Sequence, residues 1–331
     1  MFSWHSNTLK ELLALGERLP HAVLLQAPAG TGVVEFGTTW AQSLLCEAQI
    51  EGGEACGRCP ACRWFEQGNH PDFRLVQPES LAPTDPENEP AKEKKSDQIR
   101  IEQVRALQGF LTVGTHRSKW RVVLLHPADT MNPATQNALL KSLEEPPART
   151  VFILATSEPH RLLPTVRSRC RSVLLPAPAH PVALEWLKSQ GVVEAEAALQ
   201  LAGGAPLAAL GSANRLEWVR SLTRELGNRK FDPISLAAAC QGIQPAEFVT
   251  SLYRWCYDLL SIQLAGSARY HPDQERALRG LAAGCRPQRL AGFLRQLAEA
   301  RSLAQHPLNP RLVFEDLLIR YSTAIQSRAE V

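Results

Sequence analysis

The sequence lacks a strong net charge, a long apolar run and a targeting segment. Its net charge of +3 over 331 residues does not by itself indicate a nucleic-acid-binding protein, so contact with DNA requires a local patch or a partner. No stretch reaches the roughly 18 uninterrupted apolar residues of a membrane span, and no basic segment leads into an apolar run at the N-terminus. With 44% hydrophobic residues, we expect a cytoplasmic globular protein of two or three domains.

A loop with the outline of a phosphate-binding motif lacks the residues that bind phosphate. Residues 24–34 combine an apolar run, a glycine turn and a helix start. In the working motif, G-x-x-x-x-G-K-[ST], the lysine neutralises phosphate charge and the hydroxyl holds Mg²⁺. The first glycine, the lysine and the hydroxyl are replaced here, because the loop residues are Ala27, Gly30, Gly32, Val33 and Val34. We therefore predict a nucleotide-binding fold that binds no nucleotide.

The strand expected at 121–125 also lacks two acids that a nucleoside triphosphatase carries at its end. One is an aspartate that holds the metal, and the other is a glutamate that activates water. His126 and Pro127 stand in their places, and Asp129 is a nearby acid three positions further on. Proline can do neither job, and histidine is a poor ligand for Mg²⁺. We interpret His126 as a packed or capping residue.

The cysteines do not suggest a disulfide framework, but half of the eight gather in one short segment. Cys46, Cys56, Cys59 and Cys62 include two overlapping C-x-x-C units. Four thiolates can surround one ion at about 2.3 Å each, which makes the closed shell of a structural zinc site. We favour this interpretation over catalytic zinc, a DNA-binding finger, a redox pair or unrelated thiols.

Apolar runs alternate with helical patterns over the first half of the chain. Buried parallel strands are expected at 21–26, 73–76, 121–125, 151–156 and 172–175. Helices are expected at 7–19, 34–46, 101–111 and 133–145. Residues 77–98 hold four prolines, many charges and almost no apolar residues, so we predict a mobile loop there.

The second half of the chain is rich in alanine and leucine, and we expect it to be helical. Residues 176–178 indicate a hinge into a small helical lid at 176–208. An all-helical domain is expected over 209–331. We interpret Trp218, Trp255 and Tyr257 mainly as core residues of this domain.

Two features at the expected sheet edge allow more than one interpretation. Thr156 ends the fourth strand, where it either meets a ligand or only caps the strand. Residues 162–171 carry three arginines. This cluster is a solvated face, a phosphodiester-binding patch or the source of an arginine that acts on a neighbour's phosphate. Arginine suits the last role because its guanidinium is planar and permanently charged.

The order of elements, together with two motifs, resembles the clamp-loader branch of the AAA+ family. The motifs are Gln-Asn-Ala-Leu-Leu-Lys-Ser-Leu-Glu-Glu-Pro-Pro at 136–147 and the triplet Ser168-Arg169-Cys170. Residues 307–318 are similar to the closing helix of clamp-loader collars. The resemblance implies an α/β AAA+ domain with a P-loop-type parallel sheet over 1–175, the lid at 176–208, and an all-α oligomerisation collar over 209–331.

The resemblance also implies roles for single residues. Arg169, with Ser168 and Cys170, takes the place of an arginine finger that reaches into a neighbour's ATP site. The four cysteines, within an insertion at 46–62, match the family's zinc module. Thr156 falls where active relatives hold a phosphate-sensing residue. Residues 203–206 fall where active members carry a second sensing arginine, and none is present.

The function that the resemblance implies is that of a bacterial replicative clamp-loader subunit that hydrolyses no ATP. Such a subunit braces the loader ring and donates Arg169. The implied partners are the ATPase subunits (gamma/tau), the delta subunit, and, through the assembly, the sliding clamp and primed DNA. The implied cofactor is structural zinc, with no ATP and no membrane contact. The alternatives are an autonomous P-loop ATPase acting on DNA and a stand-alone zinc DNA-binding module.

Overall fold

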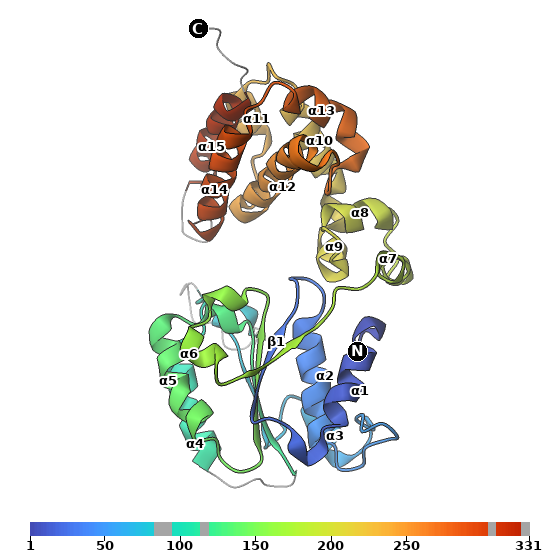
Figure 1. The fold of residues 1–331 in the computed structure, drawn as a ribbon, viewed down its shortest axis with the longest axis vertical. Helices are drawn as coiled ribbons and strands as arrows, with labels where there is room; N and C mark the ends of the chain where they lie inside the picture. The colour runs from blue at the N-terminus through green and yellow to red at the C-terminus, as the bar shows by residue number, and fades with distance from the viewer. Residues whose placement is uncertain (83–94, 113–118, 304–308, 326–331) are drawn as a thin grey trace. The chain divides into compact units, whose positions relative to one another are not determined.

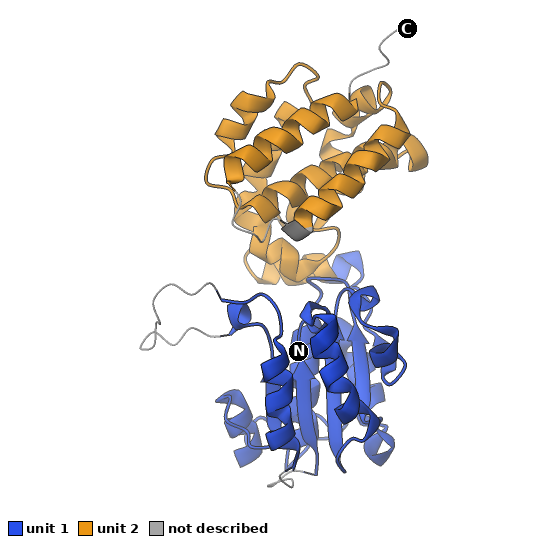
Figure 2. Ribbon diagram, turned by 90° about the vertical axis from the view of Figure 1, so that its left-hand side faces the viewer, with its two compact units in different colours: residues 1–182 blue, residues 183–331 orange. Residues whose placement is uncertain are grey.

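The computed structural model describes residues 1–82, 95–112, 119–303 and 309–325. The chain divides into two compact units, unit 1 (Met1–Val182) and unit 2 (Ala183–Val331), which Figure 2 shows in different colours. In the described part of the chain, no helix is both long and apolar enough to cross a membrane.

Unit 1 is built on a five-stranded parallel sheet. The strands are β1 (Ala22–Gln26), β2 (Phe73–Val76), β3 (Arg121–Leu125), β4 (Thr150–Thr156) and β5 (Arg171–Leu174). Their order across the sheet is β2-β3-β4-β1-β5, and all paired strands run parallel. The predicted α/β class and all five strands are therefore confirmed, with β5 starting one residue earlier than expected.

Helices cover both faces of this sheet, which explains its continuous apolar strands. Figure 1 shows α1 (Ser6–Leu13), α2 (Val33–Leu45) and α3 (Pro60–Glu66) on one side, and α4 (Ile101–Thr112), α5 (Pro133–Glu144) and α6 (Pro164–Arg167) on the other. Successive strand residues point to opposite faces. Val23 and Leu25 accordingly join the core under α2, whereas Ala22 and Leu24 join the core under α5.

The predicted mobile loop at 77–98 is described only at its two ends. A short 3-10 helix, η3 (Glu79–Leu81), follows β2. The amide of Ser80 donates to the carbonyl of Ser96 at 3.1 Å, and Arg100 pairs with Glu79 at 3.1 Å, so the two ends lie side by side. Residues 83–94, the centre of the predicted loop, lie outside the described residues.

Beyond β5, every described element of regular structure is a helix, as predicted. Its α-helices are α7 (His180–Ser189), α8 (Ala195–Leu201), α9 (Pro206–Ser212), α10 (Leu216–Leu226), α11 (Pro233–Ala239), α12 (Pro245–Ala265), α13 (Glu275–Ala282), α14 (Pro287–Leu303) and α15 (Pro310–Ile325). Two separate hydrophobic cores lie here, one spanning Ala183 to Val219 and the other Leu222 to Ile325. The division into lid and collar at 208/209 stays a prediction.

The core that spans Leu222 to Ile325 contains one of the tryptophans that we interpreted as core residues. Trp255 is fully buried, and its indole N–H donates to the hydroxyl of Tyr321 at 2.8 Å. That hydroxyl donates in turn to the carbonyl of Leu226 at 2.9 Å. Trp218 and Tyr257 are only partly buried and pack against the core from outside.

Candidate functional site

The degenerate phosphate loop lies at the carboxyl end of β1, where the motif predicts it. Gly30 and Gly32 have φ angles of 75° and 99°, and Gly32 caps α2 in the left-handed conformation. Glycine adopts this conformation without strain, so the turn keeps its shape although the other motif residues are gone. The helix begins at Val33, one residue earlier than expected.

The position of the missing lysine has become part of the core. Val33 is 8% exposed and belongs to the cluster between α2 and the sheet, and Ala27 is 4% exposed in the same cluster. Val34 is partly buried against this cluster. An isopropyl group offers no donor to a phosphate, so Val33 cannot supply the charge that a lysine gives to this loop.

The N-terminal segment covers this loop through contacts that our sequence patterns missed. The indole N–H of Trp4 donates to the carbonyl of Thr31 at 3.0 Å, and the Thr31 hydroxyl donates to the carbonyl of Pro28 at 2.7 Å. Phe2 stacks on Trp4, with ring centroids 4.6 Å apart. His5 packs edge-on against Phe36, and its burial lowers its pKa to about 4, so the ring is neutral at pH 7.

His126 and Pro127 follow β3, at the two positions where a nucleoside triphosphatase carries acids. The His126 amide donates to the carbonyl of Val76 at 3.0 Å, and burial lowers the pKa of the ring. The burial of this imidazole fits the interpretation of His126 as a packed residue.

Asp129 and Thr156 form a link that the sequence patterns did not predict. Asp129 lies in the short helix η4 (Ala128–Thr130) and is 8% exposed, and Thr156 is fully buried at the end of β4. The Thr156 hydroxyl donates a hydrogen bond to the Asp129 carboxylate and accepts one from the backbone amide of Glu158 at 3.0 Å. Thr156 therefore both caps its strand and joins β4 to the segment after β3. The one available signal was that both residues follow neighbouring strands.

Gln136 connects the start of α5 to the segment that carries the arginines. It is 1% exposed, and its side-chain amide donates to the carbonyls of Met131 at 2.8 Å and Arg161 at 3.3 Å. Its side-chain oxygen accepts the amide of Leu163 at 2.6 Å. This residue fixes η5 (Pro159–Arg161) and the start of α6 against α5.

Arg169 follows α6 and is held by two contacts. Its Nη2 lies 2.6 Å from Oε1 of Glu144, the last residue of α5, and its Nη1 donates to the carbonyl of Thr165 at 2.9 Å. The side chain remains 35% exposed. Since a guanidinium has five N–H donors, these contacts leave donors free for an anion.

The residues that flank Arg169 support its backbone rather than supply chemistry. The Ser168 hydroxyl donates to the carbonyl of Thr165 at 3.2 Å. Burial raises the pKa of Cys170 to about 11, so this thiol is not a reactive nucleophile. In the triplet predicted from sequence, a partly exposed arginine therefore follows a serine that bonds to the preceding helix and precedes a partly buried cysteine.

The four predicted metal ligands converge in space. The sulfur atoms of Cys46, Cys56, Cys59 and Cys62 all lie within 4.8 Å of one another. The sulfur of Cys46 is 3.6 Å from that of Cys56 and 3.8 Å from that of Cys59. Four sulfurs placed tetrahedrally at about 2.3 Å from one ion lie roughly 3.8 Å apart, so this set could hold a metal ion.

Backbone amides around the cluster favour the thiolate form at some of its cysteines. The amides of Cys56, Cys59 and Cys62 donate to cluster sulfurs at 3.3 to 3.4 Å. Amides near Cys56, first that of Arg58, lower its pKa to about 6. Cys59 also caps α3, a helix that begins at Pro60. The backbone of the insertion therefore folds closely around the four sulfur atoms.

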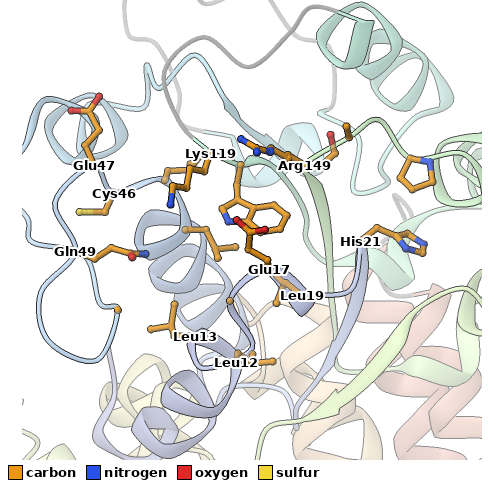
Figure 3. A pocket seen from close by; sticks show the side chains of 18 of the residues that line it. Leu12, Leu13, Glu17, Leu19, His21, Cys46, Glu47, Gln49, Lys119 and Arg149 are labelled. Atoms are coloured by element: carbon orange, nitrogen blue, oxygen red, sulfur yellow. The ribbon is translucent and has the colours of Figure 1, made fainter.

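A hollow of about 950 Å³ lies near the opposite edge of the sheet, where β1, β3 and β4 begin (Figure 3). Cys46 is the one predicted site residue in its lining. The lining carries charges of both signs, on Glu17, Glu47, Lys119 and Arg149. This mixture does not indicate one class of ligand, and the hollow lies at the opposite end of the strands from the degenerate loop and from Thr156.

Two family models match the chain. The model for "DNA polymerase III, delta subunit" matches residues 5–179, and the model for "DNA polymerase III, delta subunit, C terminal" matches residues 211–323. One match lies in unit 1 and the other in unit 2, and residues 180–210 lie between them.

Individual relatives agree with these models. DNA polymerase III subunit delta' of Pseudomonas aeruginosa is 42% identical over 193 residues, which are 57% of this chain and 54% of that protein. Its counterpart in Escherichia coli K12 is 31% identical over 98% of this chain and 96% of that protein. A solved gamma-subunit-related protein of DNA polymerase III from Thermotoga maritima covers 97% of this chain and 99% of its own, with a TM-score of 0.47 and 19% identity. The chain therefore belongs to the family of DNA polymerase III delta' subunits, as the order of its elements and its clamp-loader motifs led us to expect.

Proposed function

We propose that the chain is a clamp-loader subunit that hydrolyses no ATP and supplies Arg169 to the ATP site of a neighbouring subunit. The observation that carries this proposal is a contrast within unit 1. Val33 packs into the core at the position where a phosphate loop needs lysine. The guanidinium of Arg169, in contrast, is held by Glu144 and stays partly exposed. A chain that cannot hold nucleotide itself can still stabilise charge on a nucleotide held by its neighbour.

Arg169 is suited to this role because its position is set before a neighbour arrives. Gln136 fixes the start of α6, and Glu144 and the Thr165 carbonyl hold the guanidinium. A preorganised cation loses little conformational freedom when it meets a phosphate, and the developing charge in the transition state strengthens the contact. Glu144 is then a positioning residue for Arg169.

The proposed cofactor is a structural zinc ion held by Cys46, Cys56, Cys59 and Cys62. Four sulfur ligands leave no open position for water or substrate, so the ion would supply folding energy rather than catalysis. It would tie the end of α2 to α3, because the ligands come from the residue after α2, from the segment leading into α3 and from α3 itself.

The proposed partners are the gamma/tau ATPase subunits and the delta subunit, which together act on the sliding clamp and primed DNA. Purified chain should form one complex with these subunits from the same organism in native mass spectrometry. Adding this chain to gamma/tau and delta should raise the rate of clamp loading on primed DNA. Equal loading rates with and without the chain, or no complex at all, would contradict the proposed function.

A further inference from the structure

Two adjoining hollows lie in unit 2, between α10 and the start of α13. The outer one has a volume of about 630 Å³ and is lined by Arg220, Arg224, Asp273, Gln274, Arg276 and Ala277. The inner one, of about 70 Å³, shares Arg220, Asp273 and Gln274 with it and reaches the buried His271. We call the outer hollow the arginine groove.

Two of the three arginines in the groove have no charge partner. Arg220 is already paired, because its Nη1 donates to Oε1 of Glu194 at 3.1 Å. This pairing raises the pKa of Arg220, and the charge of Asp273 acts in the same direction. The side chains of Arg224 and Arg276 are exposed and make no hydrogen bond or ion pair with the described residues. Like charges that line one groove repel each other, and an anion placed between them removes this cost.

The backbone adds positive charge at the same place. Gln274 is the N-cap of α13, and Arg276 and Ala277 lie in the first turn of this helix. The N-terminal end of a helix carries about half a positive charge and favours phosphate groups. The acid of this turn, Glu275, is outside the lining of the groove and pairs with Arg279 at 2.9 Å. The helix end therefore acts in the same direction as the two unpaired arginines.

His271 brings a buried nitrogen without a partner to the inner hollow. The ring is 3% exposed, and its Nδ1 lies 2.9 Å from the carboxylate of Asp258. That carboxylate also accepts the backbone amides of Arg269, Tyr270 and His271 at 2.7 to 3.0 Å, which fixes the ring. The other ring nitrogen, Nε2, is buried on the side away from Asp258 and makes no hydrogen bond with the described residues. Such an atom indicates a water or a ligand, and the inner hollow has room for a few waters.

This arrangement suits the backbone of a nucleic-acid strand better than a carboxylate or a free nucleotide. One carboxylate satisfies one guanidinium, whereas successive phosphates of a strand can meet two separate arginines. A free nucleotide carries Mg²⁺ on its phosphates, so its charge is already partly neutralised. A strand instead gains free energy by releasing its condensed counter-ions, and concave basic grooves follow the backbone of a single strand.

We propose that the arginine groove binds the phosphodiester backbone of a single nucleic-acid strand. Arg224 and Arg276 each meet one phosphate, and the first turn of α13 adds its partial positive charge. Nε2 of His271 bonds to the strand through water held in the inner hollow. The net charge of +3 demands a local patch for any contact with DNA, and the groove is such a patch. The inference is independent of the proposed function, because it requires neither Arg169 nor a neighbour's ATP site.

The test measures binding of a labelled oligonucleotide of about 20 thymidines to the isolated full chain by fluorescence anisotropy, between about 50 and 200 mM salt. Arg224→Ala and Arg276→Ala should each weaken binding about 5- to 10-fold near 50 mM salt. Each should also reduce the slope of log K against log salt by about 0.7, the contribution of one phosphate on a single strand. Arg224→Lys should keep the slope, because counter-ion release needs only the charge.

Two further variants complete the design. Arg289→Ala is the matched control, since this exposed arginine of α14 lies outside the lining of the groove, and it should change neither affinity nor slope. His271→Asn keeps a donor for Asp258 and removes Nε2, so it should weaken binding about threefold. Thermal unfolding of Arg224→Ala and Arg276→Ala should match that of the wild type, because both side chains are exposed and unpaired.

Several outcomes would overturn the inference. One is a wild-type chain that binds no oligonucleotide, and another is an unchanged salt slope in both Arg224→Ala and Arg276→Ala. Displacement of the oligonucleotide by an equal concentration of a glutamate peptide, or by about 1 mM pyrophosphate, would show that the groove selects carboxylates or free phosphate instead. Slopes that depend on Arg224 and Arg276 with duplex DNA alone would exclude a single strand. Wild-type affinity in His271→Asn would remove the inner hollow from the site.

Discussion

Replacing Arg169 by alanine is expected to leave the loader assembled and to lower ATP hydrolysis at the neighbouring site at least tenfold. An arginine finger speeds hydrolysis about 10³- to 10⁵-fold at a single site. The measured drop in ATP turnover is smaller, because the other ATP sites of a loader keep hydrolysing. Clamp loading should fall in parallel, because loading depends on that hydrolysis. The measurement is the rate of ATP turnover and of clamp loading on primed DNA by the reconstituted complex.

Arg167→Ala is the control for this prediction. Arg167 is the exposed last residue of α6, two residues before Arg169, so its loss removes the same charge without the finger. Glu144→Gln should cause a smaller loss than Arg169→Ala, because it weakens the placement of the guanidinium and keeps its charge. Full loading activity in Arg169→Ala, or an equal loss in Arg167→Ala, would remove Arg169 from the role of finger.

Removing the metal is expected to have the largest effect on stability. Metal analysis of purified protein should give about one zinc per chain. Cys59→Ser, or dialysis against a strong chelator, should release it and lower the midpoint of thermal unfolding by roughly 10 °C. This value follows from a loss of about 4 kcal/mol, the scale at which loss of a bound metal destabilises a protein, and a shift of about 2 to 4 °C per kcal/mol in a domain of this size. Calorimetry with and without added zinc checks it.

Cys170→Ser is the matched control for the metal prediction. Cys170 lies in unit 1, outside the sulfur cluster, and is partly buried like Cys46 and Cys59. Its substitution should leave the zinc content unchanged. Protein that contains no metal and unfolds at the same temperature as a zinc-loaded sample would refute the structural role of the four cysteines.

The strands and the loop could be predicted from the sequence because their signals are local. Apolar runs such as that in β3 and the glycines of the loop need no distant partner to show what they form. Asn132 and the pair Pro146-Pro147 likewise bound α5, whose last helical residue is Glu144. The spacing of four cysteines predicted their convergence in the same way.

The contacts that place Arg169 could not be predicted, because they join residues far apart in sequence. Glu144 lies 25 positions before Arg169 and meets it only because α5 packs beside α6. The hydrogen bonds of Gln136 to Arg161 and Leu163 have the same origin. The pairing of Asp129 with Thr156 joins two neighbouring strands that are also consecutive in the chain, but the sequence does not show which residues near their ends meet.

The central claim is that this chain has turned its own phosphate loop into packing and contributes to a neighbour's site instead. Equilibrium titration of labelled ATP against the isolated chain, with Mg²⁺ present, tests the first half of that claim most directly. No saturable binding is expected at ATP concentrations up to about 1 mM, where any free energy of binding is weaker than roughly −4 kcal/mol. A dissociation constant in the micromolar range would contradict the account, since Val33 and Val34 could then not have ended nucleotide binding.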